Sequence, residues 1–136
     1  MIRKDYILRM VEEFAKFLAA IMGLKDEGKY EEALKKIDSV YTGLLNIEPV
    51  TVKAISTDEV LDFLKTEKKF TNQYLNMVAE LLYEEGMIYA EMGDPVSTRN
   101  VLEKSKVLIN FLSENDQTFS YDWYEKLKNI ELILEE

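Results

Sequence analysis

Gly86 interrupts a strongly helical stretch, LYEEGMIYAEMGDP at residues 82–95, seven residues before a second glycine, Gly93. Gly93 is simple to explain, because glycine often ends a helix by adopting a left-handed backbone conformation. A glycine inside a helix instead costs about 1 kcal/mol relative to alanine. We therefore expect Gly86 to serve packing, since a residue without a side chain lets a neighbouring helix approach closely.

Apolar residues recur at steps of three and four along most of the chain, which predicts amphipathic helices. The first spans residues 2–27, and its predicted inward residues are Tyr6, Met10, Phe14, Phe17, Ile21 and Leu24, flanked by Ile7, Val11 and Leu18. Gly28 ends this helix, and Glu31 and Glu32 suit the first turn of the next one. So short a turn predicts an antiparallel helical hairpin.

Pro49 ends the second helical pattern, and residues 48–57, EPVTVKAIST, are predicted to form an extended connector rather than a strand, because a lone strand would have no partner. The sequence STDE at residues 56–59 is a capping box, which predicts a short third helix from about residue 57. A long fourth helix follows, from about residue 66 or 70 to Met92. All regular structure is thus expected to be helical up to this point.

The sequence Gly93-Asp94-Pro95 marks the end of the fourth helix and the start of the fifth. Glycine suits the end of a helix, aspartate the N-cap of the next, and proline its first turn. A sixth helix is predicted after a turn at residues 113–118. Together these patterns predict an all-α protein of about six helices.

The composition limits the classes of function. The chain has 136 residues, 47% hydrophobic, and we predict one domain over residues 1–136. It has no cysteine and no histidine, which removes thiolate nucleophiles, imidazole bases and common transition-metal ligands. Its net charge of −9 disfavours nucleic acid and anionic membranes as partners.

The first residues superficially suggest a secretory signal, because two basic residues precede apolar ones. Arg9, Glu12, Glu13 and Lys16 break the apolar run, and its longest stretch, residues 17–24, is too short to span a bilayer. We therefore expect this segment to belong to the mature fold and the protein to be cytoplasmic.

The segment GMIYAEMGD at residues 86–94 resembles the first helix and turn of a tetratricopeptide repeat. GKYEEALKKI at residues 28–37 resembles the turn and second helix of another such repeat. The opening MIRKDYILRMVEEF, the GKYEEAL turn and the length also resemble a family of small bacterial proteins of unknown function with tetratricopeptide-like structure. The resemblance implies helical hairpins stacked in a right-handed superhelix.

The sequence departs from the repeat pattern at several positions. Ile21 stands where the first hairpin should have a small residue, and Thr98 and Ser105 occupy positions that usually hold alanine. Gly28 and Gly93 are 65 residues apart, slightly less than two repeats of 34. The segment between them would therefore be a degenerate unit with one short helix.

In tetratricopeptide repeats, the stacked first helices line a groove that binds peptides. Carried over position by position, the resemblance implies partner-binding residues Leu18, Met22, Glu80, Tyr83, Met87 and Glu91, with Ala15, Lys25, Asp26 and Ala90 beside them. Methionine and tyrosine bordered by carboxylates would suit the apolar face of a basic segment of another protein. The alternative is that Leu18, Met22 and Met87 are covered by the chain's own third helix or by a second copy.

The densest aromatic cluster comprises Phe119, Tyr121, Trp123 and Tyr124. One interpretation is a terminal helix that folds back and covers the apolar face of the last hairpin. The other is a homodimer contact through Phe119, Trp123 and Tyr124, because aromatic residues are enriched at interfaces.

The paired acids Glu12–Glu13, Glu31–Glu32 and Glu84–Glu85 do not suggest a metal site, because adjacent helical residues point about 100° apart. We predict that they lie on solvated faces, and we expect no metal, no cofactor and no catalytic activity. The favoured function is a protein-binding scaffold. The alternatives are a self-associating structural protein and a helical bundle that binds a small ligand in an internal cavity.

Overall fold

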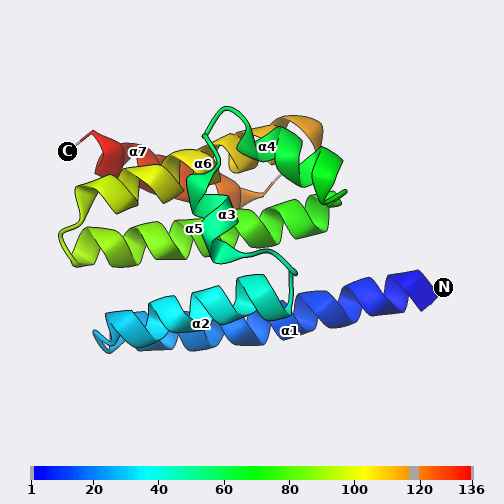
Figure 1. Cartoon of the computed structure of the whole chain (residues 1–136), viewed down its shortest axis with the longest axis horizontal. Coiled ribbons are helices and arrows are strands. Elements are labelled where there is room, and N and C mark those ends of the chain that lie inside the picture. Colours follow the sequence, from blue (N-terminus) through cyan, green and yellow to red (C-terminus); the bar gives the residue numbers. More distant parts are fainter. Residues whose placement is uncertain (1, 117–119, 136) are drawn as a thin grey trace. The chain divides into compact units, whose positions relative to one another are not determined.

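The computed structural model describes residues 2–116 and 120–135, with side chains from residue 5 onward. Within these ranges every regular element is helical, and no strand is present (Figure 1). This confirms the all-α prediction. The chain forms two compact units, Met1–Pro49 and Val50–Glu136. Among the described helices, none combines the length and apolar character needed to cross a membrane.

The first unit is an antiparallel hairpin of α1 (Ile2–Asp26) and α2 (Tyr30–Gly43) (Figure 1). Gly28 connects them with a φ of +75°, a conformation that favours glycine. Its buried residues are Phe14, Ile21, Ala33, Ile37, Val40 and Tyr41. The predicted hairpin is thus confirmed.

Helix α1 is much longer than its partner, with 25 residues against 14 in α2. At 1.5 Å per residue, α2 covers only about 21 Å of a helix of about 37 Å. Tyr6, which was predicted to point inward, is therefore exposed and is 53% accessible.

The second unit contains α3 (Pro49–Ala54), α4 (Val60–Asp62), a π-helical turn η1 (Phe63–Glu67), α5 (Asn72–Glu91), α6 (Pro95–Asn115) and α7 (Tyr121–Leu134). The prediction of an extended connector at residues 48–57 was wrong for residues 49–54, which form α3. Proline ends a preceding helix but also suits the first position of a new one, where its missing N–H is not needed. Pro49 begins α3 in this way.

The capping-box prediction was displaced by a few residues. The Ser56 hydroxyl donates a hydrogen bond to Glu59 Oε1 at 2.9 Å, and α4 begins only at Val60.

The boundary between α5 and α6 was predicted correctly: Gly93 has a φ of +74°, Asp94 accepts a hydrogen bond from Ser97 N at 3.1 Å, and Pro95 starts α6.

Helices α5 and α6 form a closely packed antiparallel hairpin. A β-carbon added to Gly86 would overlap the side chain of Leu102 on α6. The two helices are also close two turns before Gly86 on α5, where Ser105 Oγ donates a hydrogen bond to the carbonyl of Ala79 at 2.8 Å. The expected packing role of Gly86 is confirmed. Helix α7 contacts both α5 and α6.

Candidate helix-binding surfaces

The exposed face of α1 carries a second apolar stripe, separate from the face that packs on α2. Its members follow one another at steps of three and four: Leu8, Val11, Ala15, Leu18 and Met22. Leu8 is 53% accessible, and Val11 and Met22 are 41% accessible each. Ala15 is exposed and Leu18 half-buried. This alternating spacing is that of a coiled-coil seam. We call these five residues the α1 stripe.

Carboxylates border the α1 stripe on the side away from the hairpin core. Asp5, Glu12 and Asp26 are exposed. Together with Ala19 they form one row along α1, in which each residue follows the previous one by seven positions. Arg9 and Lys16 lie one row farther from the stripe, by helical geometry. A helix that packed on the stripe would therefore meet carboxylates first at this edge.

Sequence reasoning found part of the α1 stripe and missed its beginning. Leu18 and Met22 were predicted as partner-binding residues, whereas Leu8 was not singled out. The missed signal is the width of the apolar arc on α1, which is greater than one partner helix can cover. An arc this wide indicates two apolar seams on one helix.

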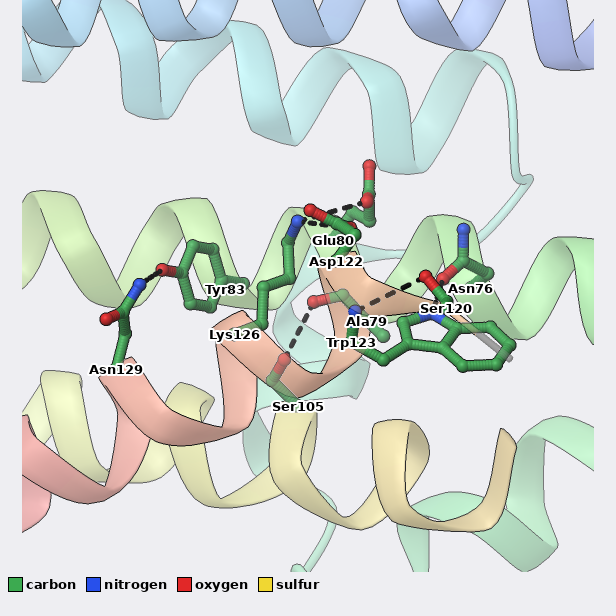
Figure 2. A network of polar contacts seen from close by, with 10 residues as sticks. All are labelled: Asn76, Ala79, Glu80, Tyr83, Ser105, Ser120, Asp122, Trp123, Lys126 and Asn129. Atoms are coloured by element: carbon green, nitrogen blue, oxygen red, sulfur yellow. Dashed lines mark hydrogen bonds and ion pairs between the residues drawn. The ribbon is translucent and has the colours of Figure 1, made fainter. Parts of the chain in front are cut away.

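The second surface is the face of α5 that contacts α7, where polar side chains pair in register (Figure 2). Trp123 Nε1 donates to Asn76 Oδ1 at 2.7 Å, and Asn129 Nδ2 donates to the Tyr83 hydroxyl at 2.9 Å. Between these two pairs, Lys126 Nζ lies 3.3 Å from Glu80 Oε1.

The spacing of these pairs follows from the helical repeat. Asn76, Glu80 and Tyr83 recur at steps of four and three on α5, and we call them the α5 row. Trp123, Lys126 and Asn129 recur at steps of three on α7, and we call them the α7 row. Residues at these spacings share one helix face, so two parallel helices can match all three pairs at once.

The central ion pair of this interface is largely removed from water. The side chains of Glu80 and Lys126 are each 14% accessible, and Lys126 also contacts Asp122 Oδ2 of its own helix at 2.7 Å. Burial opposes the charge of Lys126, but the carboxylates of Glu80 and Asp122 outweigh it and raise the pKa of that ammonium. The Lys126 ammonium also lies 5.2 Å from the centre of the Tyr83 ring.

The α7 contacts decide the availability of the predicted partner residues on α5. Tyr83 is buried and Glu80 is nearly so, and both are engaged by α7 of the same chain. They are not open to an external partner while α7 is in place. Met87 is half-buried and Glu91 is exposed. Their role in partner binding stays a prediction.

The aromatic cluster is divided between two faces of α7. Trp123 is half-buried against Asn76, whereas Tyr121 is 67% and Tyr124 is 55% accessible. Phe119, the third residue predicted for self-association, lies outside the described residues. The described part of α7 covers the last hairpin, as one of the two interpretations expected. A dimer contact through Tyr124 stays a prediction.

A buried polar cluster holds α3 against α5 and α6. Lys104, only 2% accessible, donates hydrogen bonds to the carbonyls of Val52 at 2.9 Å and Lys53 at 2.8 Å, and to Asn100 Oδ1 at 2.6 Å. These carbonyls lie at the C-terminal end of α3, where helices have unpaired acceptors and favour a positive charge. Lys104 thus caps α3 from another helix.

Glu85 supplies the opposite charge in this cluster. Its carboxylate is fully buried and lies 3.1 Å from Lys53 Nζ. Burial lowers the pKa of Lys53, but the Glu85 carboxylate outweighs this effect, so the net shift is upward. The pKa of Lys104 is lowered, because its burial outweighs the same carboxylate. The prediction that Glu84 and Glu85 are solvated was wrong, since both are buried.

A surface pocket of about 350 Å³ lies at the α5–α6 turn, beside Thr98, Arg99 and Leu134. The guanidinium in its lining is already engaged: Arg99 donates to Glu103 Oε1 at 2.8 Å and to the carbonyl of Leu134 at 3.0 Å. Across residues 2–116 and 120–135, no group of three acidic side chains is placed to hold a metal ion.

Comparison with known proteins adds no relative: no family model, no curated protein and no solved structure matches this chain. The fold alone defines the class of this protein, an all-α protein built from helical hairpins.

Proposed function

We propose that this protein is a non-enzymatic, cytoplasmic protein-binding module that uses the α1 stripe to bind an amphipathic helix of another protein. The observation that carries the proposal is the exposure of Leu8, Val11 and Met22 at coiled-coil spacing. Apolar residues at this spacing are normally paired, and contiguous exposed apolar surface usually marks an interaction site.

The carboxylates along the edge of the stripe favour a partner whose flanking residues are basic. Asp5, Glu12 and Asp26 would face the residues that border the partner's own apolar seam, the positions that set partner choice in coiled coils. In an antiparallel pair of two α1 helices, the same carboxylates would face each other and repel. The stripe therefore fits a basic helix better than a second copy of itself.

The tetratricopeptide resemblance supports the same class of function. Two observations agree with a repeat-like architecture: the α1–α2 hairpin turns at Gly28, and Gly86 allows the close contact with α6. Tetratricopeptide proteins bind peptides on their first helices, and α1 is the first helix of its hairpin. The exposed stripe includes Ala15, Leu18 and Met22, three positions that the resemblance assigns to the groove.

Two synthetic helical peptides test this proposal. Both carry leucine at every seam position, while one has lysine and the other glutamate at the flanking positions. Fluorescence anisotropy with the full-length protein should show binding of the lysine peptide, weakening as salt concentration rises because exposed charges are screened. Failure of both peptides to bind would contradict the use of the stripe.

A pair of variants shows where the peptide binds. Met22→Lys places a charge in the stripe and should weaken binding of the lysine peptide at least tenfold. Ala20→Lys adds the same charge at an exposed position on the opposite face of α1 and should leave binding nearly unchanged. Equal loss in both variants would indicate a general charge effect rather than contact with the stripe.

A further inference from the structure

The contact between α7 and α5 differs in character from the contact between α5 and α6. The α5–α6 hairpin buries a continuous apolar core that includes Leu82, Leu102 and Leu108. Of the described residues of α7, only Ile130 is fully buried, and the three pairs in register are polar (Figure 2). Polar groups regain hydrogen bonds to water when they separate, so we expect α7 to leave α5 at a lower cost than α6 would.

The geometry points to α7 as an exchangeable helix: α7 of one copy binds the α5 row of a second copy, and the exchange is reciprocal. The exchanged contact is chemically identical to the one within the chain, because both copies carry the same Asn76, Glu80 and Tyr83. Such an exchange forms a dimer at low cost. It gives this chain a concentration-dependent mode of self-association that uses a different surface from the α1 stripe.

Two features of the α7 contact favour recognition in trans. The α5 row and the α7 row match in three pairs of different chemistry, so a helix shifted by one turn would lose its pairing. Asp122, which also contacts Lys126, belongs to α7 and stays beside Lys126 when α7 binds another copy.

Charge reversal of the central pair gives a direct test. In a Glu80→Lys chain, the lysine introduced at position 80 would repel Lys126. In a Lys126→Glu chain, the glutamate introduced at position 126 would repel Glu80. Neither chain can form the wild-type Glu80–Lys126 pair, alone or with itself. Asp122, which lies beside both positions, offsets part of the repulsion in the Glu80→Lys chain and adds to it in the Lys126→Glu chain. A reciprocal exchange between the two chains gives two new contacts. At one, Lys126 of the first chain meets Glu80 of the second, as in the wild type. At the other, the introduced lysine of the first chain meets the introduced glutamate of the second, so the charges are again opposite.

The measurement is the mass of the equimolar mixture by size-exclusion chromatography with light scattering. We expect a heterodimer fraction at least tenfold greater than the dimer fraction of either chain alone. The Glu80→Lys/Lys126→Glu double variant is the matched control: it has opposite charges at the two positions within one chain, although its introduced glutamate lies beside Asp122, and it should form no more dimer than the wild-type chain does. If a single variant does not fold alone, the two are refolded together, and the heterodimer is still expected.

Two results would overturn the exchange. One is that the mixture of the two single variants keeps the mass of a monomer. The same holds if the two variants yield no heterodimer when they are refolded together. The other is a dimer that forms equally in all chains, including the double variant, because its contact would then lie outside the Glu80–Lys126 pair, for example at Tyr124. Neither result bears on peptide binding at the α1 stripe.

Discussion

The side chain of Leu102 on α6 occupies the space that a β-carbon at Gly86 on α5 would need. Both residues are fully buried, and the two helices are connected only by a tight turn. The cost of a glycine inside α5 is thus offset by close contact across the hairpin. This relationship explains why a glycine lies within the buried part of a long helix.

Replacing Gly86 with alanine should destabilise the protein. The added methyl group forces Leu102 to move, and overpacking of a core destabilises a protein by about 1–3 kcal/mol. The higher helix propensity of alanine offsets about 1 kcal/mol of this loss. Urea unfolding followed by circular dichroism measures the difference. Gly23→Ala is the control, because Gly23 lies within α1 with open space around its α-carbon and should gain up to about 1 kcal/mol. Equal effects at both positions would contradict the packing role.

Replacing Lys104 with methionine should loosen α3. The substitution keeps an apolar stem but removes the donor for the carbonyls of Val52 and Lys53, and a buried acceptor left without a partner costs about 1–3 kcal/mol. Hydrogen exchange should accelerate in α3 more than in α5. Lys106→Met is the control, because Lys106 forms an exposed contact with Glu131, at 3.7 Å. Unchanged exchange in α3 would show that Lys104 does not hold it.

Replacing Trp123 with alanine should lower the melting temperature. The change removes the hydrogen bond to Asn76 and the half-buried indole that packs between α7 and α5, a loss of about 2 kcal/mol. Tyr124→Ala removes a ring that is 55% accessible and should change the free energy of unfolding by less than about 0.5 kcal/mol. A lower oligomeric mass with unchanged melting temperature in the Trp123 variant would instead indicate a dimer contact.

The N-cap of α6 should make stability depend on pH. Hydrogen bonds from Ser97 hold the pKa of Asp94 below its usual value of 3.8. A carboxylate with a depressed pKa in the folded state stabilises the fold above pH 3.8, and this contribution is lost as the pH falls through the folded pKa. The Asp94→Asn variant keeps a capping oxygen that does not titrate in this range. The melting temperature of the wild-type chain should therefore fall relative to that of Asp94→Asn in acid, and parallel curves would contradict the cap.

Local signals in the sequence were sufficient for most helix boundaries. Gly28 and Gly93 adopt the positive φ predicted for them, and Asp94 and Pro95 begin α6 as expected. These features depend only on the conformations that glycine and proline allow and on the first turn of a helix. Pro49 was misinterpreted because the same residue can end one helix or begin another, and its neighbours do not decide between the two.

The candidate surfaces were less predictable than the helices. Leu18 and Met22 were identified by their position in a repeat-like pattern, but the same reasoning placed Tyr83 on an open face that α7 covers. Asn76, Lys126 and Asn129 were not recognised, because isolated polar residues at helical spacing are common on solvated faces. These side chains find their partners only where α7 packs against α5 in the folded protein.

The sequence by itself determined the all-α class, the close approach at Gly86 and the turns at Gly28 and Gly93, because each follows from local backbone preferences and helical periodicity. The tertiary structure alone decided the burial of Glu85 and Lys104, the capping of α3 and the pairing of the α5 and α7 rows. Those outcomes depend on which side chains from distant segments meet, since a charge is tolerated in a core only where another segment supplies its partner.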